Sequence, residues 1–414
     1  MAGKKVVVIG GGAAGLMAAG EAARMGADTL LLEKMKKPGR KICISGKGRC
    51  NITNIADLPD FISHFGKTGN FLRQSFSRFF SIELMDFFTG QGLELVSERG
   101  GRVFPASGKA YDVLDVLVRW VEESGVKVMK SAKVTELIVG DGLVSGVICN
   151  GKRIESAAVI LTTGGASYPA TGSTGDGYRF AASVGHTIIP IRPALVPLEV
   201  KGELTRTMAD LNLRNIVVRM YVNGKKRKQA FGELVFNETG LTGPVILTLS
   251  GHAVDALRQG ERVELSIDLK PALDEQKLDA RLLRDFASRG KEELQSVLRG
   301  LLPREMVPVC LRLTGIDPGT MASQLSGKKR GRLRRWLKDF RLEVTGYRPF
   351  AEAIITAGGV DTREVDPRTM ESKKVGGLFL AGELLDIQGD TGGYNLQAAF
   401  STGWLAGRSA AMEK

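Results

Sequence analysis

Cysteine is scarce in this chain of 414 residues, which contains only four. Cys43 and Cys50 stand seven positions apart and Cys149 and Cys310 are isolated, so their spacing fits neither a disulfide framework nor a zinc site. Cys43 and Cys50 also lack the C-x-x-C spacing of redox-active pairs. We therefore expect free thiols, no bound metal, and a reducing, cytoplasmic setting.

Histidines and long apolar runs are also rare. The chain has three histidines, His64, His186 and His252, which form no triad pattern, so we expect each to have a structural role. No run approaches the roughly 18 apolar residues of a membrane-spanning helix, so no span is expected. The N-terminal Lys4-Lys5 precedes an apolar stretch in the manner of a signal peptide, but the glycine spacing that follows favours a folded strand and helix.

Glycine and positive charge are both in excess. Glycine accounts for 52 of 414 residues and clusters at the ends of apolar runs, where a backbone can approach a ligand closely. The formal net charge is +13, and part of it lies in residues 224–228 and 328–335. A basic chain attracts anions such as nucleic acid or a phosphorylated cofactor. Neither cluster has the interleaved aromatic residues that stack bases, so a nucleic-acid partner is not favoured.

The N-terminal region has the pattern of a strand, a helix and a second strand. Residues 5–9 form a short β-branched run typical of a buried parallel strand. Residues 13–25 are rich in Ala, Leu and Met, and Gly26 follows where a helix commonly ends. Residues 29–33 form the second strand. This order predicts a right-handed crossover and a parallel sheet.

A G-x-G-x-x-G motif joins the first strand to the helix. Gly10 permits a tight turn, Gly12 lets the backbone approach a pyrophosphate, and Gly15 lets the helix pack against the strand. The helix N-terminus then offers unpaired N–H groups. Glu33, at the end of the second strand, is placed to accept hydrogen bonds from ribose hydroxyls. The predicted dinucleotide site comprises Gly10, Gly12, Ala13, Ala14, Gly15 and Glu33.

The C-terminal segment 382–399 indicates that the dinucleotide is FAD. Glu383 follows an apolar run, where a carboxylate can bind ribityl hydroxyls, and Gly382 precedes it. A helix beginning near Asn395 and Leu396 can direct N–H groups at the flavin pyrimidine. These features favour FAD over NAD as the bound cofactor.

Two more glycine-rich segments are expected beside the cofactor. Residues 39–54 form a basic loop just after the ribose carboxylate, where cationic side chains can neutralise a phosphate or a reduced flavin. Residues 162–165 run from a strand into a turn, and residues 171–177 open a helix for which Asp176 is a plausible cap. The residues predicted to contact FAD here are Arg40, Lys41, Ser45, Gly46, Arg49, Asn51, Thr163 and Gly164.

The middle of the chain differs from both ends in composition and in the secondary structure that its pattern predicts. Three prolines fall close together at 190–197; residues 195–270 then read as mostly strands and residues 272–340 as charged helices. From about residue 350 the glycine-rich, strand-and-turn texture returns. We expect an α/β, Rossmann-like FAD-binding domain with a parallel sheet, interrupted by an inserted domain.

Several longer motifs resemble one bacterial family, the NAD(P)/FAD-dependent oxidoreductases (flavoproteins) that include 3-dehydro-bile-acid Δ4,6-reductase. The motifs span nearly the whole chain; they are residues 45–51 (SGKGRCN), 101–105 (GRVFP), 165–169 (GASYP), 232–236 (GELVF), 242–244 (TGP) and 392–395 (GGYN). The family commonly has glycine where this chain has Lys47, a difference from which we expect little consequence.

This resemblance implies an insertion that is part β-barrel and part helical. The expected domains are 1–192 (FAD-binding, first part), 193–345 (inserted; β-barrel-like 193–270, helical 271–345) and 346–414 (FAD-binding, second part). By position, the resemblance also implies FAD contacts at Ala14, Glu33, Arg40, Lys41, Val134, Glu383, Asn395 and Leu396. Of these, Val134 reads only as strand in the sequence itself.

The resemblance further implies hydride transfer from the flavin to a C=C bond conjugated to a ketone, in a hydrophobic or steroid-like small molecule. Such a reaction needs a donor for the developing enolate and an acid for the second carbon. The candidates are Tyr168, Tyr394, Arg49 and Arg102. A second strand–GxGxxG–helix unit is not found, so NAD(P)H is expected to dock only transiently.

Two alternatives stay open. The charge of +13 permits an RNA-associated flavoprotein, which steep salt-dependent RNA binding would support. The run Thr174-Gly175-Asp176-Gly177 is loosely similar to the fumarate-reductase group and permits an oxidase or dehydrogenase of a small acid. The sequence does not indicate an oligomeric state.

Overall fold

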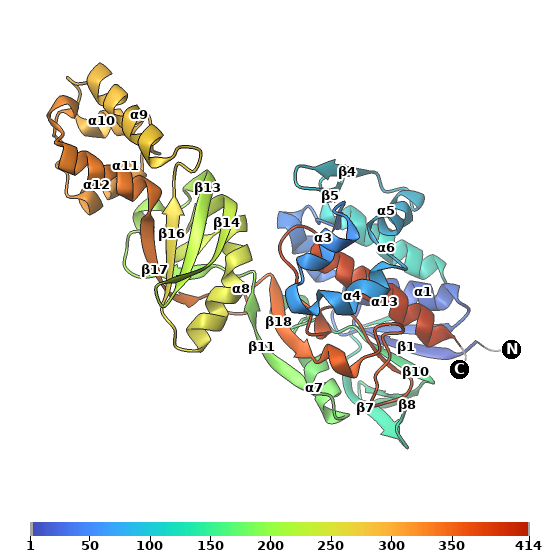
Figure 1. The fold of residues 1–414 in the computed structure, drawn as a ribbon. Coiled ribbons are helices and arrows are strands. Elements are labelled where there is room, and N and C mark those ends of the chain that lie inside the picture. The colour runs from blue at the N-terminus through green and yellow to red at the C-terminus, as the bar shows by residue number, and fades with distance from the viewer. Residues whose placement is uncertain (1–2, 413–414) are drawn as a thin grey trace. The chain divides into compact units, whose positions relative to one another are not determined.

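The structure is a computed structural model that describes residues 3–412. The chain divides into two compact units (Figure 1). The first unit joins the N-terminal segment up to Pro193 to the C-terminal segment from Phe350 onward, and the second is Ala194–Pro349.

A five-stranded parallel sheet forms the centre of the first unit, with strand order β19-β10-β1-β2-β6. β1 lies between β2 and β10, and Val8 is in register with both Leu31 and Ile160. Such a sheet buries both faces, which explains its continuous apolar runs. The strands are β1 (Lys5–Ile9), β2 (Asp28–Glu33), β6 (Lys127–Lys130), β10 (Ala158–Leu161) and β19 (Leu378–Leu380).

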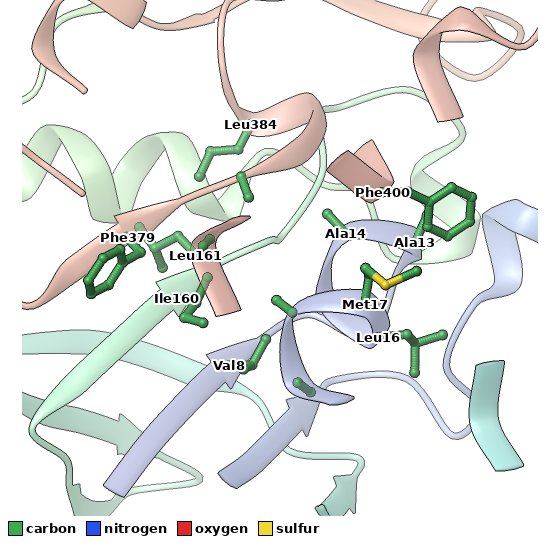
Figure 2. Close-up of a cluster of buried hydrophobic side chains, with 14 of the residues drawn as sticks. Val8, Ala13, Ala14, Leu16, Met17, Ile160, Leu161, Phe379, Leu384 and Phe400 are labelled. Atoms are coloured by element: carbon green, nitrogen blue, oxygen red, sulfur yellow. The ribbon is translucent and has the colours of Figure 1, made fainter. Parts of the chain in front are cut away.

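Two helices from opposite ends of the chain pack closely beside this sheet. They are α1 (Ala13–Arg24) and α13 (Tyr394–Ala411). A Cβ on Gly403 would lie 2.3 Å from the Ala14 carbonyl oxygen, and one on Gly407 would lie 2.2 Å from that of Ala18. Both positions therefore require glycine. Figure 2 shows buried side chains around this contact, including Val8, Leu16, Met17, Leu161 and Phe400.

Smaller sheets and helices complete the first unit. The three-stranded sheets are β3-β5-β4 and β7-β8-β9, and β11 pairs with β18. These strands are β3 (Thr53–Asn54), β4 (Leu95–Glu98), β5 (Arg102–Pro105), β7 (Val134–Gly140), β8 (Leu143–Cys149), β9 (Lys152–Glu155), β11 (Ile188–Ala194) and β18 (Ile355–Val360). The other helices are α2 (Arg40–Ile44), α3 (Leu58–Ser63), α4 (Gly69–Phe76), α5 (Ser81–Gly90), α6 (Ala110–Glu123) and α7 (Asp176–Ser183).

The second unit is a closed barrel with attached helices. Its strand order is β12-β15-β14-β13-β16-β17. The strands are β12 (Leu198–Val200), β13 (Asn212–Val222), β14 (Lys225–Phe236), β15 (Gly240–Thr242), β16 (Val263–Asp268) and β17 (Phe340–Tyr347). The helices are α8 (Pro244–Arg258), α9 (Glu275–Ser288), α10 (Leu294–Leu298), α11 (Met306–Thr314) and α12 (Gly327–Lys338). This architecture confirms the predicted fold class.

Two details of the insertion differ from our prediction. The stretch 195–270, which we expected to be mostly strands, contains the 15-residue helix α8. The segment 271–345, expected to be helical, ends in the barrel strand β17, which pairs with β16. Helices α9–α12 are therefore an excursion between two neighbouring strands of the barrel, and we call residues 270–339 the helical lobe.

Within residues 3–412, no helix combines the length and apolarity that crossing a bilayer requires. The same residues contain no cluster of three or more His, Cys, Asp or Glu side chains suited to a metal ion. The four cysteines are free thiols. Burial raises the pKa of Cys50 to about 12, so this thiol stays protonated and unreactive.

His186 and Glu364 tie the two segments of the first unit together. The buried His186 bonds Glu364 Oε2 through Nδ1 (3.0 Å) and Ser372 Oγ through Nε2 (2.8 Å). Desolvation alone raises the pKa of Glu364, but bonds from Lys374, Thr187 and His186 outweigh it and lower that pKa to about 2. A depressed carboxyl pKa adds stability above the unfolded value of 4.5.

That added stability is lost as the pH falls from 4.5 towards 2, which gives a testable prediction. Between about pH 5 and pH 3 we expect the wild type to lose about 1–2 kcal/mol more unfolding free energy than Glu364→Gln, after allowance for solvent screening. Urea unfolding at both pH values measures the difference. Parallel pH profiles for the two proteins would contradict this role of Glu364.

Candidate functional site

The turn after β1 is built around two glycines that tolerate no side chain. Gly10 has φ +101°, and its Cβ would lie 2.6 Å from the Thr162 carbonyl oxygen. A Cβ on Gly15 would lie 1.8 Å from the Gly10 carbonyl oxygen. These contacts show why the sequence spaces its glycines as it does: they let α1 start directly over the end of β1.

Gly12 differs from both, because a Cβ there would meet no atom within 4 Å. Gly12 is the N-cap of α1, and no side chain caps this helix end. The first N–H groups of α1, including those of Ala13 and Ala14, have no acceptor within the helix. Open space in front of free donors at a positive helix end suits an anion such as a pyrophosphate.

Glu33 organises the same turn. It is buried, with Oε2 accepting a hydrogen bond from the Gly11 N–H (2.7 Å) and Oε1 from the Met35 N–H (2.7 Å). An ionised carboxylate has about four acceptor sites, so it can still receive ribose hydroxyls. The sequence predicted that ribose contact and missed the role of Glu33 in holding the glycine turn. Val134, at the start of β7, is also buried, and the nearby Ala132 N–H donates to the Glu33 carbonyl oxygen (2.9 Å).

Lys41 and Glu383 form an ion pair across 342 residues of sequence. Lys41 Nζ lies 2.6 Å from Glu383 Oε2, and both side chains are largely buried. Oε1 of Glu383 accepts a bond from the Thr356 N–H (2.8 Å). Gly382, just before it, has φ +75° and packs on Ala14. The pair therefore lies beside the start of α1, while Arg40, the preceding residue, is exposed.

The loop at residues 45–51 adopts an unusual backbone. Gly46 and Lys47 both have left-handed φ values, +55° and +58°, in a short turn (Ser45–Gly48). Lys47 therefore occupies a conformation that favours glycine, which is the residue common at this position in the family that the sequence resembles. Our expectation of little consequence overlooked this backbone constraint. The Ser45 hydroxyl donates to the Ile42 carbonyl oxygen (2.7 Å) and so holds the loop.

Asn51 Oδ1 and Thr163 Oγ1 are two of the six side-chain N and O atoms that are buried without a partner among the described residues. Asn51 follows the glycine loop, and Thr163 follows β10 at the carboxyl edge of the sheet. Gly164, next in the chain, has φ +70°. Buried polar atoms without partners are rare in folded proteins. Thr163 Oγ1 packs against Gly177, where a Cβ would lie 1.9 Å from it, so the open space at Gly12 is the feature that fits a polar ligand such as FAD along this edge.

The start of α13 is a second helix end with available donors. Its N-cap is Gly393, with φ +101°, so the first N–H groups, including those of Asn395 and Leu396, lack acceptors within the helix. The Asn395 side chain accepts from the Gly389 N–H (2.8 Å) and donates to the carbonyl oxygens of Gly389 (2.9 Å) and Asp390 (3.1 Å). Its side-chain amide therefore shapes the preceding loop, and its backbone N–H has no acceptor within the helix.

The four candidate proton donors lie in different surroundings. Arg49 and Arg102 lie over Phe104, and Arg49 Nη2 lies 2.5 Å from Glu98 Oε1. Tyr394 is buried, packed edge-on against Phe61, and burial raises its pKa to about 12. Tyr168 is half-buried.

Tyr168 has the least common backbone of the four. Its φ is +49°, a left-handed value that is rare for an aromatic residue and is often found at functional sites. Its N–H donates to the Phe350 carbonyl oxygen (2.9 Å). Desolvation, with the nearby charge of Glu352, raises the pKa of its phenol, so the hydroxyl stays protonated at neutral pH. The neighbouring Ser167 and Thr356 hydroxyls bond each other (2.7 Å).

One feature of this region differs from expectation, and one contact was not predicted. Asp176 is the first residue of α7 rather than its cap, and its carboxylate instead bonds Lys34 Nζ (2.7 Å). His64 bonds Asp390 through Nδ1 (2.8 Å), and its ring stacks on Tyr394 at 4.0 Å. The sequence offered no signal for that contact, because 326 residues separate His64 from Asp390.

Comparison with known proteins places this geometry in a family. The model of the HI0933-like protein Rossmann domain matches residues 4–409. The chain is 34% identical to the 3-dehydro-bile acid delta(4,6)-reductase of Clostridium scindens, over 98% of this chain and 99% of that protein. It is 31% identical to the ribosomal RNA dihydrouridine synthase of Escherichia coli, over 96% of each chain.

Among solved structures, the fold resembles the 3-ketosteroid delta1-dehydrogenase of Sterolibacterium denitrificans. The TM-score is 0.53 at 14% identity, over 98% of this chain and 99% of that one, and this likeness concerns the fold alone. The sequence matches agree with the predicted FAD site at the carboxyl edge of the parallel sheet. The chain belongs to the HI0933-like family of Rossmann proteins and is an FAD-dependent oxidoreductase.

Proposed function

We propose that the protein reduces a C=C bond conjugated to a carbonyl group, with a hydride that originates from NAD(P)H. When bound, FAD supplies the hydride-transfer chemistry. The structural observation that carries the proposal is the placement of Tyr168, which follows the Thr163–Gly164 turn at the carboxyl edge of the sheet and has a left-handed backbone. The names of the two full-length relatives describe reactions of this kind, since dihydrouridine is uridine with its carbonyl-conjugated C=C bond saturated.

Several of the predicted FAD contacts in the first unit have a definite role in this proposal. The N–H groups at the start of α1 would hold the pyrophosphate, and Glu33 the adenosine ribose. Glu383, oriented by Lys41 and by the Thr356 N–H, would hold the ribityl chain. The first N–H groups of α13 would face the pyrimidine edge, where negative charge develops on reduction.

Tyr168 is the donor that we assign to the reacting carbonyl or carbon. Addition of a hydride to one carbon of an enone leaves an enolate, which must be stabilised at oxygen and protonated at the other carbon. The Tyr168 hydroxyl is protonated at neutral pH and can donate a hydrogen bond, and its left-handed backbone and N–H bond to Phe350 orient the residue. Arg49 is paired with Glu98, and the Tyr394 ring is packed among aromatic side chains, so both suit a structural role better.

A hydrophobic small molecule, such as a steroid or bile-acid enone, is the substrate class that we favour. The Clostridium scindens relative, 34% identical over almost the whole chain, supports it. A second candidate substrate is a uracil base in RNA. The Escherichia coli relative supports that candidate, as does the helical lobe, where residues 270–339 contain 16 Lys and Arg against 9 Asp and Glu.

Anaerobic half-reactions of the holoprotein test the proposal. We expect NADH or NADPH to bleach the absorbance of bound FAD and a conjugated enone to restore it, with one NAD(P)H oxidised per FAD reduced and one enone reduced per FAD reoxidised. The acceptors are steroid enones, bile-acid enones and uridine-containing RNA, and the matched control for each is its saturated counterpart. Recovery with saturated and unsaturated compounds alike, or with none of the acceptors, would contradict C=C reduction.

A further inference from the structure

The excess positive charge of the protein is concentrated in the helical lobe. The whole chain has a formal net charge of +13, and the 16 basic against 9 acidic residues of 270–339 supply more than half of it. Within the lobe the charge is densest on α12, which reads GKKRGRLRRWLK. Reduction of a hydrophobic enone in the first unit would leave this charge without a role.

α12 uses one side for packing and another for contacts within the lobe. Leu333, Trp336 and Leu337 are buried in the core of the second unit. On the α9 side, Arg330 Nε lies 3.0 Å from Asp279 Oδ1, and Arg334 Nη2 lies 3.4 Å from Glu275 Oε2. These residues explain how the helix is held.

Four basic residues of α12 remain: Lys328, Lys329, Arg332 and Arg335. Among residues 3–412 no carboxylate is within ion-pair distance of any of them, and Arg332 Nε is buried without an acceptor. Lys328, Arg332 and Arg335 follow each other at intervals of four and three residues, which places them on one helix face. Like charges at these spacings destabilise a free helix, so the arrangement suits an anion supplied from outside.

The same face has open space at Gly331. Gly331 lies between Lys328 and Arg335, and a Cβ there would meet no atom within 4 Å. The apolar side chains of α12 are all directed into the core, so the face lacks the apolar residues by which an amphipathic helix enters a membrane surface. It also lacks the aromatic and apolar centre of a typical protein interface.

We propose that this face of α12, formed by Lys328, Lys329, Arg332 and Arg335, binds the phosphate backbone of RNA. Guanidinium groups bind phosphate oxygens in a bidentate manner, and lysine adds point charges. The contacts are to phosphates, so they position the RNA without reading its sequence. The inference rests on the RNA candidate of the proposed function and adds the surface that would hold such a substrate.

The hairpin between β13 and β14 offers a matched control. It carries Lys225, Lys226, Arg227 and Lys228, also four basic residues. Val222, at the hairpin end of β13, pairs with Val263 at the start of β16, whereas the helical lobe follows Asp268 at the other end of β16. Replacing either set of four with glutamine lowers the formal net charge by the same amount, at opposite ends of the barrel.

Binding of a short labelled RNA duplex to the holoprotein, measured over a range of salt concentrations, tests the proposal. Replacing the four α12 residues with glutamine should weaken binding on the order of 100-fold at about 0.15 M salt and reduce the slope of log affinity against log salt by about 3. The hairpin variant should stay within about threefold of the wild type, since it loses no phosphate contact. Equal losses in the two variants, or no RNA binding by the wild type, would overturn the proposal.

Two further measurements separate this surface from the reaction. FAD absorbance should be unchanged in both variants, because the predicted FAD contacts lie in the first unit. Vesicles containing phosphatidylglycerol should bind no more weakly to the α12 variant than to the hairpin variant; selective loss of vesicle binding without loss of RNA binding would assign the face to a membrane and refute our proposal. If the α12 variant alone loses RNA binding but the wild type reduces no uracil in RNA, the surface stands and the RNA candidate for the reaction fails.

Discussion

Replacing Gly12 with valine should leave the protein folded and without FAD. A Cβ at Gly12 would meet no protein atom within 4 Å, and the φ of Gly12 is −83°, which any L-residue adopts. The protein itself therefore has room for the side chain. The space that valine would fill lies in front of the first N–H groups of α1, where we place the pyrophosphate. We expect FAD affinity to fall on the order of 1000-fold, about 4 kcal/mol.

Two measurements test this prediction. The FAD-to-protein ratio after gel filtration measures the loss of FAD, and thermal unfolding of the apoprotein shows whether the fold is retained. Gly90→Val is the matched control, because a Cβ there also meets nothing within 4 Å and the residue ends α5, outside the predicted site. Gly15→Val should instead prevent folding, since its Cβ would lie 1.8 Å from the Gly10 carbonyl oxygen. Normal FAD content in Gly12→Val would show that the pyrophosphate lies elsewhere.

Gly10, Gly12 and Gly15 illustrate why the first βαβ unit could be predicted from sequence. At each position a separate constraint, either steric or related to the ligand, requires glycine. These constraints act within a few residues of sequence, so the spacing of the glycines is enough to predict the turn. Other contacts at the site join residues that are hundreds of positions apart in the sequence. Lys41 meets Glu383, and His64 meets Asp390, only because the C-terminal segment returns to the N-terminal sheet. No local pattern encodes which side chains such a return brings together.

The errors in the insertion have a different origin. In α8, the sequence Pro244-Val-Ile-Leu-Thr is rich in β-branched residues and reads as a strand, although proline at the first helical position was a signal for a helix. In β17, the alternating burial of Phe340, Leu342 and Val344 is typical of a strand, but this short run directly follows the charged helix α12. In both places the local sequence is compatible with a strand or a helix, and packing in the barrel determines which one forms.

The Tyr168→Phe substitution removes one hydroxyl. It should slow the reoxidation of bound, reduced FAD by the enone substrate on the order of 100- to 1000-fold. The physical reason is that the enolate produced by hydride addition would lose the hydrogen-bond and proton donor that we assign to this phenol. The aromatic ring remains, so packing around the Thr163–Gly164 turn should be preserved. The reduction of bound FAD by NAD(P)H needs no acid from the protein, so its rate should be unchanged.

Stopped-flow measurement of the two half-reactions separates this role from a structural one. A defect confined to reoxidation supports Tyr168 as the donor, whereas equal slowing of both halves, or loss of FAD, would indicate that the residue only maintains the fold of its turn. Tyr111→Phe is the control, because Tyr111 is 64% exposed on α6 and its substitution should leave both rates unchanged.

The pH profile of the reoxidation rate adds a second criterion. Burial raises the pKa of Tyr168, so the wild-type reoxidation rate should stay constant across neutral pH and fall only when the phenol ionises in strong alkali, and the phenylalanine variant should lack that alkaline fall.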